Sequence, residues 1–240
     1  MALAFNKENY ALHKLHSLTG VVPVGYYMVQ HLALNTFTLA GPQYFNNVIH
    51  FFEAMPKHLL LGLEIFGIWI PMLFHAVYGL FINSRGLKNN TVPQYAKYRE
   101  NRYYSFQRWS GIFIFIFLCY HVASTTGVKM YTNSTESIEY AAMAAKFTAN
   151  GYIMFVFYAL GILTSTYHFS YGLWSFCIRW GITVSEKSQA RMFKISGGVF
   201  VGLLLMGWAA LAGFLIHDPK KGIETKPGTS IEAPVEVKKV

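Results

Sequence analysis

Five long apolar segments dominate the pattern of hydrophobic and polar positions along the chain. Each is close to the roughly 20 apolar residues that a helix needs to cross a hydrocarbon core about 30 Å thick. The pattern therefore predicts an all-α integral membrane fold with five transmembrane helices. The segments are Leu18–Thr38, Leu59–Ile82, Trp109–Thr126, Tyr152–Phe176 and Ile195–His217.

Composition supports a membrane protein and divides the chain into two parts. Hydrophobic residues make up 53% of the chain and charged residues only 13%, which is outside the usual mix of a soluble domain. Residues 1–217 are predicted to form one membrane domain. Residues 218–240 mix five Lys with acidic residues and Pro, so we expect a disordered polar tail there.

Basic residues are distributed unevenly between the two ends of the predicted helices. Lys and Arg in short loops resist translocation and so remain on the cytoplasmic side. The segments that connect the predicted helices on one side of the membrane contain three cations: Lys57, Lys129 and Lys146. The segments on the opposite side, with the N-terminal segment, contain twelve. This asymmetry predicts a cytoplasmic N-terminus and an outside C-terminus. The twelve are Lys7, Lys14, Arg85, Lys88, Lys97, Arg99, Arg102, Arg108, Arg179, Lys187, Arg191 and Lys194.

Charge and cysteine content exclude two classes of function. The net charge of +9 is spread around hydrophobic spans, so it is explained by orientation and is not typical of a nucleic-acid-binding protein. The two cysteines, Cys119 and Cys177, lie in different predicted helices and outside any Cys-x-x-Cys-His motif. Covalent attachment of a c-type haem is therefore not expected.

Each of the first four predicted helices contains one deep histidine: His31, His75, His121 and His168. An ionisable group in hydrocarbon is costly and functional by default, although a single one can also serve as an interhelical hydrogen bond. His31 and His121 lie about 20 and 18 Å above the inner boundary. His75 and His168 run inward and lie about 24 Å below the outer boundary. Depth thus predicts two pairs, roughly 12 Å apart in level.

Two histidine pairs at two levels suit two non-covalent b haems held in a bundle of four of the five helices. Two imidazoles on each iron leave no open coordination position, so the expected activity is electron transfer and not oxygen binding. The other ring nitrogen of each histidine should hydrogen-bond a carbonyl or hydroxyl group.

Glycines recur beside these histidines. Gly79 and Gly172 follow His75 and His168 by four residues, one helical turn further along the same face. They would leave room for a haem plane or, alternatively, allow close helix packing. Thr19-Gly20 and Ser110-Gly111 precede His31 and His121 by about three turns, so the four helices resemble two related hairpins.

Short motifs around the four histidines resemble one family. They are LHSLTGVVPVG at 15–25, QHL at 30–32, LEIF at 63–66, HAVYG at 75–79, Gln107-Arg108, HFSYGLW at 168–174 and WGIT at 180–183. Over roughly residues 11–190 the chain closely resembles the di-haem cytochrome b558 anchor of succinate dehydrogenases and quinol:fumarate reductases, the complex II family. The fifth helix and the tail are weakly matched.

The resemblance implies a membrane subunit of a succinate:quinone oxidoreductase in a bacterial cytoplasmic membrane. His75 and His168 would ligate the inner, proximal haem, and His31 and His121 the outer, distal one. The subunit would pass electrons between an iron–sulfur subunit and a membrane quinone, with menaquinone the family's usual partner for two-haem anchors. FAD, the iron–sulfur clusters and the dicarboxylate site would belong to partner subunits, because this chain has neither a Gly-rich dinucleotide motif nor a Cys cluster.

Further candidate site residues lie at both ends of the bundle. At the inner end, we expect four residues to hydrogen-bond haem propionates or a quinone, with snorkelling to lipid headgroups as the alternative for the arginine: His16, Ser17, Gln107 and Arg108. At the outer end, His50, Glu53 and Glu64 are candidates for proton transfer to quinone. Simple hydration explains Glu64 about equally well.

Two other functions remain possible at this point. One is a di-haem cytochrome b that serves another quinone-linked dehydrogenase, such as a formate or hydrogen enzyme. The other is a transporter in which the four histidines form a proton or metal path. A haem absorbance spectrum would exclude the transporter, and copurified flavin with succinate or fumarate activity would exclude the other dehydrogenase.

Overall fold

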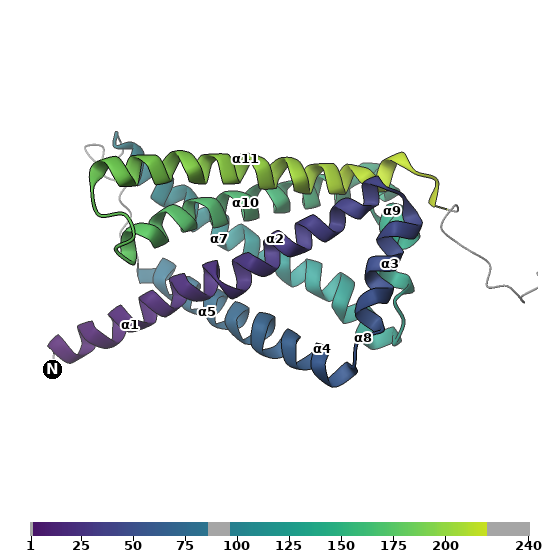
Figure 1. The fold of residues 1–240 in the computed structure, drawn as a ribbon, viewed down its shortest axis with the longest axis horizontal. Helices are drawn as coiled ribbons and strands as arrows, with labels where there is room; N and C mark the ends of the chain where they lie inside the picture. The colour runs from purple at the N-terminus through teal and green to yellow at the C-terminus, as the bar shows by residue number, and fades with distance from the viewer. Residues whose placement is uncertain (1, 86–96, 220–240) are drawn as a thin grey trace, which may run out of the picture.

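The computed structural model describes residues 2–85 and 97–219, and all regular structure within them is helical. The predicted tail beyond residue 219 and the part of the inner loop that contains Lys88 lie outside the described residues. Helices run along the length of the molecule, several of them at an angle to one another (Figure 1). They are α1 (Ala2–Val21), α2 (Pro23–Asn35), α4 (Lys57–Glu64), α5 (Ile70–Arg85), α7 (Arg99–Val122), α10 (Ile153–Arg179) and α11 (Glu186–Ile216).

Four helical runs in the described residues are long and apolar enough to cross a membrane. They are Lys57–Arg85, Arg99–Thr132, Tyr140–Arg179 and Glu186–Ile216, and they coincide with four of the five predicted spans, the last of which was predicted to end one residue later, at His217. The remaining prediction, Leu18–Thr38, coincides with a helical path that is divided at Val22 into α1 and α2. Pro23 lacks a backbone N–H, so it favours the first turn of a new helix at this point.

Two of the long runs contain a π-helical turn. Ile65–Trp69 separates α4 from α5, and Ala123–Gly127 separates α7 from α8 (Val128–Thr132). Pro71 explains the first turn, because its missing N–H leaves a carbonyl one turn earlier without its usual donor. The second turn begins two residues after His121 and contains Ser124 and two threonines.

Short helices cover the end of the bundle opposite the N-terminus (Figure 1). α3 (Pro42–Glu53) and α9 (Tyr140–Thr148) occupy segments that the apolar pattern did not predict as helices. Tyr140 is fully buried there, and its hydroxyl donates to the Gly213 carbonyl of α11 at 2.6 Å. Thr38 donates to the Ala210 carbonyl at 2.7 Å. These bonds fix the outer end of α11 to the preceding segments.

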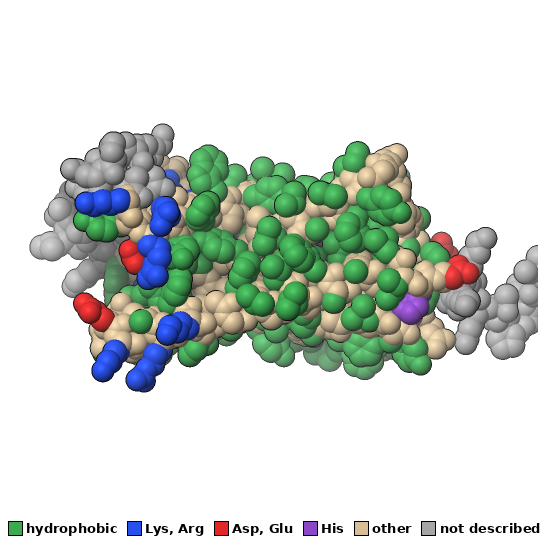
Figure 2. All heavy atoms as spheres, turned by 90° about the horizontal axis from the view of Figure 1, so that it is seen from above, with side chains coloured by type: hydrophobic (Ala, Val, Ile, Leu, Met, Phe, Trp, Pro, Cys, Tyr) green, Lys and Arg blue, Asp and Glu red, His purple; other side chains and the backbone are tan. Residues whose placement is uncertain are grey.

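Charge separates the two ends of the molecule. Figure 2 shows an apolar middle, with Lys and Arg side chains gathered at the end that contains the N-terminus of α1 and the loop between α10 and α11. Large apolar side chains of α4, α5 and the π-helical turn between them are exposed, among them Leu61, Phe66 and Leu73. An apolar belt of this kind is typical of a surface in contact with lipid.

Candidate functional site

The four deep histidines meet as two pairs. His31 of α2 faces His121 of α7, with ring centres 5.9 Å apart and planes at 80°. His75 of α5 faces His168 of α10, with ring centres 6.2 Å apart and planes at 87°. These are the pairs that depth in the predicted helices had selected.

Backbone carbonyls orient both rings of the inner pair, His75 and His168. His75 Nδ1 donates to the carbonyl of His16 at 2.9 Å. His168 Nδ1 donates to the carbonyl of Gln107 at 3.2 Å and lies 3.1 Å from the Ser110 hydroxyl oxygen. A carbonyl can only accept, so Nδ1 carries the proton in each ring. The lone pair on Nε2 therefore remains available for a metal.

Glycines from two other helices approach the rings of the inner pair. A Cβ added at Gly20 would lie 2.3 Å from the His75 ring, and one at Gly111 would lie 3.1 Å from the His168 ring. Gly20 follows His16 by four residues, and Gly111 follows Gln107 by four. Thus α1 and α7 each place a backbone carbonyl against a ligand ring and, one turn later, a glycine against the same ring. Both hairpins therefore share this arrangement.

Gly79 and Gly172, which follow the inner ligands on their own helices, each lie against another helix. A Cβ at Gly79 would meet the His16 ring at 3.1 Å, and one at Gly172 would meet the Gln107 amide at 3.5 Å. Both contacts agree with the explanation by close helix packing. The contact of Gly20 with the inner pair was not predicted.

The outer pair, His31 and His121, is surrounded by side chains. His121 Nδ1 lies 3.4 Å from the hydroxyl of Tyr158, which is only 5% exposed. The rings of Phe117 and His121 are stacked 5.7 Å apart, and those of Tyr27 and His31 lie 5.6 Å apart. The phenol of Tyr158 can either donate or accept, so it does not fix the His121 tautomer as a carbonyl would.

A polar chain leads away from the outer pair. Ser124 donates to the carbonyl of His121 at 3.3 Å, and the Ser124 carbonyl accepts from Lys146 Nζ at 3.0 Å. Ser124 lies in the π-helical turn after His121, where the regular ladder of backbone hydrogen bonds is interrupted. Lys146 thus stabilises this turn with a charged donor. The charge pattern of the sequence predicts Lys146 only as an outer cation.

Of the four predicted inner residues, His16 and Gln107 contact the inner pair, and the contacts of Ser17 and Arg108 are with other residues. The His16 ring stacks on His75 at 4.0 Å with an angle of 10° between the planes. The Gln107 amide donates to the carbonyl of His168 at 3.0 Å. Ser17 accepts from the Trp180 indole at 3.1 Å, and Arg108 donates to the side chain and carbonyl of Asn83.

His13 lies at this inner end, before the predicted first span. Burial and the positive charge of Arg179 lower the pKa of His13. Its ring also contacts Tyr78, with the ring centres 5.6 Å apart. The imidazole is therefore neutral at physiological pH, and the basic end of the molecule owes its charge to Lys and Arg.

The three outer candidates for proton transfer occupy different environments. Glu64 interacts electrostatically with Tyr27, whose ring contacts His31. Glu53 forms an ion pair with Lys129, and His50 lies 4.0 Å from Glu139 near the surface. Only Glu64 therefore has a described connection to the outer histidine pair.

Comparison with known proteins gives two matches. Residues 66–185 match the family described as ferric reductase like transmembrane component, and this stretch contains three of the four histidines. The chain is also 38% identical over 210 residues to the succinate dehydrogenase cytochrome b558 subunit of Bacillus subtilis (strain 168). That alignment covers 88% of this chain and 98% of the relative.

This chain belongs to the succinate dehydrogenase cytochrome b558 subunit family. The resemblance noted from its motifs is thereby confirmed. Because the alignment spans nearly all of the Bacillus subtilis protein, the family assignment covers the bundle as a whole and is not limited to a shared local motif.

Proposed function

We propose that this chain is the membrane anchor and electron-transfer subunit of a succinate:quinone oxidoreductase, and that it binds two b haems. His75 and His168 would ligate the inner haem, and His31 and His121 the outer one. The observation that carries the proposal is the pairing of four intramembrane histidines, each pair on two different helices, at distances that suit one metal.

The ring separations support two bis-imidazole sites. A bond between a metal and an imidazole nitrogen is about 2 Å long, so two rings on one metal have centres roughly 6 Å apart. The observed separations of 5.9 and 6.2 Å agree with this requirement. Among the described residues no group of three or more His, Cys, Asp or Glu is placed to hold a metal ion.

Unpaired polar atoms next to the inner pair also suit a cofactor with a polar edge. His16 Nδ1 and the Tyr78 hydroxyl are buried without a hydrogen-bond partner in the structure, and their rings lie 5.9 Å apart. A buried polar group without a partner costs about 1–3 kcal/mol. A haem propionate would supply an acceptor for them, with Ser17, Gln107 and Arg108 close to the same end of the bundle.

These contacts indicate the role of each residue at the haem sites. Haem with two imidazole ligands supplies one-electron transfer without an open position for oxygen. His16 and Gln107 hold the ligand tautomers through their carbonyls, and Gly20 and Gly111 allow the helices to approach the rings. Aromatic side chains of Phe117, Tyr158 and Tyr27 pack against the rings of the outer pair.

Orientation and partners follow from charge. We infer five membrane spans, with α1–α2 as the first, a cytoplasmic N-terminus and an outside C-terminus in a bacterial cytoplasmic membrane. The basic end would then face the cytoplasm and dock the iron–sulfur subunit, which in turn binds the flavoprotein subunit. FAD, the clusters and the dicarboxylate site belong to these partners.

Menaquinone is the proposed quinone, and Glu64 is the best placed of the three proton-transfer candidates. Its charge acts on Tyr27, whose ring centre lies 5.6 Å from that of His31 of the outer pair. Reduction or oxidation of a quinone moves protons together with electrons, so an acid beside the outer pair would serve both directions of the reaction.

Haem counting tests the proposal directly. The complex should contain two b haems for each copy of this chain, as measured by pyridine haemochrome absorbance. Replacement of His168 by Ala should remove one haem and leave the other, and replacement of His121 by Ala should remove the other one. A preparation made with ample haem supply that shows no Soret band would overturn the assignment.

A further inference from the structure

Lys146 of α9 is one of the three predicted outer cations, and its surroundings differ from those of the other two. Lys57 is exposed, and Lys129 forms an ion pair with Glu53. Lys146 is partly buried, and no ion pair within the described part of the chain includes it. Its positive charge is therefore less hydrated than that of Lys57 and, unlike that of Lys129, has no carboxylate partner among the described residues.

The packing of α9 fixes the position of Lys146 beside the outer pair. Ala144 and Phe147, on either side of it in the same helix, are only 2% and 1% exposed. The Phe147 ring lies 4.9 Å from that of Tyr158, and the Tyr158 ring lies 5.6 Å from that of His121. Because side chains in such a core are closely packed, α9 has little freedom to move away from His121.

The ammonium of Lys146 is bound to the π-helical turn that follows His121. A lysine near the end of a span usually extends toward the headgroups. Lys146 Nζ instead donates to the carbonyl of Ser124 at 3.0 Å and lies 3.5 Å from the hydroxyl oxygen of the same residue. Ser124 follows His121 by three residues, less than one helical turn. The ammonium therefore lies on the order of 10 Å from the His121 ring.

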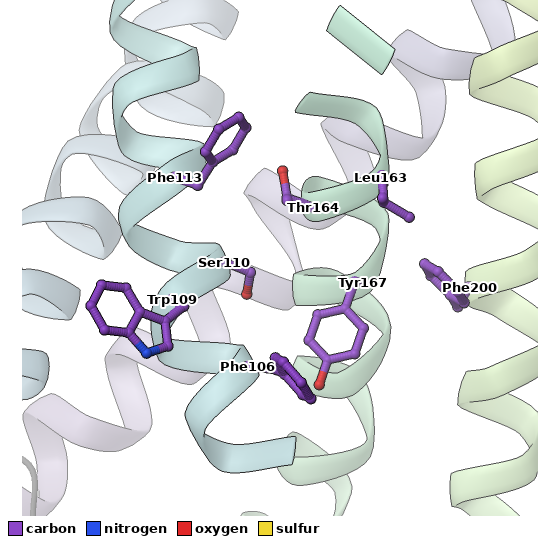
Figure 3. A pocket seen from close by; sticks show the side chains of 8 residues that line it. All are labelled: Phe106, Trp109, Ser110, Phe113, Leu163, Thr164, Tyr167 and Phe200. Carbon is purple, nitrogen blue, oxygen red and sulfur yellow. The ribbon is translucent and has the colours of Figure 1, made fainter. Parts of the chain in front are cut away.

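The inner pair, by contrast, borders a groove without charged side chains. This groove lies between α7 and α10, has a volume of about 440 Å³, and is lined by eight residues that are all uncharged (Figure 3). Ser110 belongs to the lining, and its oxygen lies 3.1 Å from Nδ1 of His168. A cation bound next to the ligand is thus a feature of the outer pair that this side of the inner pair lacks.

We propose that the positive charge of Lys146 raises the potential at which the outer site accepts an electron. The inference rests on the proposed function, in which His31 and His121 ligate the outer haem. One electron is exchanged there, and the oxidised form of the site carries one positive charge more than the reduced form. A cation held nearby repels the oxidised form more strongly. Lys146 therefore favours transfer of the electron from the inner site to the outer one.

Potentiometric titration of the assembled complex tests the effect of this charge. At roughly 10 Å and an effective dielectric constant of about 20, two unit charges change an equilibrium constant about tenfold. Lys146→Met removes the charge, so it should lower the outer potential by about 59 mV, the equivalent of a tenfold change for one electron. The inner potential should change much less. The two potentials are assigned with His121→Ala and His168→Ala, each of which should retain one haem.

Three further variants separate charge from hydrogen bonding. Lys146→Arg keeps the charge and should keep the outer potential. Lys146→Gln keeps a donor for the Ser124 carbonyl but not the charge, so it should lower the potential as Lys146→Met does. The matched control is Lys57→Met, which removes an exposed cation from the same end of the molecule. Because solvent and salt screen exposed charges, it should leave both potentials unchanged.

Several outcomes would overturn the role of this charge. They are an unchanged outer potential in Lys146→Met, an original potential in Lys146→Gln, and an equal shift in Lys57→Met. Loss of the outer haem in both Lys146→Met and Lys146→Gln would also overturn it, since Lys146 would then be required for the structure of the site. Absence of two b haems from the original complex would instead contradict the proposed function.

Discussion

The inner and outer histidine pairs have similar ring separations, but different chemical groups orient their rings. The inner pair, His75 and His168, is oriented by backbone carbonyls and closely approached by Gly20 and Gly111. The outer pair is oriented by side chains, above all Tyr158. A main-chain carbonyl cannot be removed by substitution, whereas a phenol can. The inner site should therefore be sensitive to added bulk, and the outer site to the loss of side-chain polar groups.

The largest expected effect comes from adding one methyl group beside the inner pair. Gly20→Ala places a Cβ within 2.3 Å of the His75 ring, so the ring must move away from His168. We expect loss of the inner haem and retention of the outer one, measured by pyridine haemochrome and low-temperature spectra. Gly111→Ala is the matched control, because its contact of 3.1 Å requires only a small shift. If Gly20→Ala kept both haems, the close approach would have no role in binding.

The next largest effect is expected near the outer pair. Glu64→Gln preserves the shape of the side chain but removes the charge that acts on Tyr27. Quinone turnover should therefore fall roughly tenfold or more while both haems remain. Steady-state assays with a menaquinone analogue measure this change. Glu53→Gln is the control, since Glu53 is engaged by Lys129. Unchanged turnover in Glu64→Gln would exclude the proposed proton transfer.

A smaller effect is expected from Tyr158→Phe, which removes the hydroxyl next to His121 Nδ1 and keeps the ring. One hydrogen bond contributes about 1 kcal/mol, so the potential of the outer haem should shift by tens of millivolts. Potentiometric titration should show no change at the inner haem. A shift confined to the inner haem would reverse our assignment of the two levels.

Ser110→Ala should have the smallest effect of the four. His168 Nδ1 keeps its bond to the Gln107 carbonyl, so only the second contact, at 3.1 Å, is lost. We expect a shift of the inner-haem potential smaller than that of Tyr158→Phe at the outer haem. The same titration tests this ranking, and an equal or larger shift would show that the hydroxyl, and not the carbonyl, dominates the orientation of His168.

The sequence predicted the level of each histidine because level depends only on helix direction and rise per residue. That argument predicted both histidine pairs. The apolar pattern predicted the four helical runs that are long enough to cross a membrane. Depth contains no information on how a helix is rotated or which neighbour it faces. For this reason the contacts of Gly20 with His75 and of Gly79 with His16, each on another helix, were not predicted.

Local geometry and short helices were also beyond the apolar pattern. The pattern detects long runs, so it did not detect α3 and α9, which pack aromatic residues such as Phe45 and Tyr140 against α11. The π-helical turn at Ala123–Gly127 contains Ser124, whose carbonyl accepts from Lys146 on another helix, a contact that an apolar pattern cannot show. Pro23 divides the first helical path, which the apolar pattern predicted as one span.

The division of that path at Val22 gives the two sites different mechanical connections. α1 contains His16 and Gly20, which serve the inner pair, and α2 contains His31, which belongs to the outer pair. A change in the tilt of α1 can therefore adjust the inner site while His31 stays in place. α7 has no such break between Gln107 and His121, and neither has α10 between Tyr158 and His168, so both helices connect the two sites directly. Strain from docking a partner on the basic end would reach the outer site along α7 and α10.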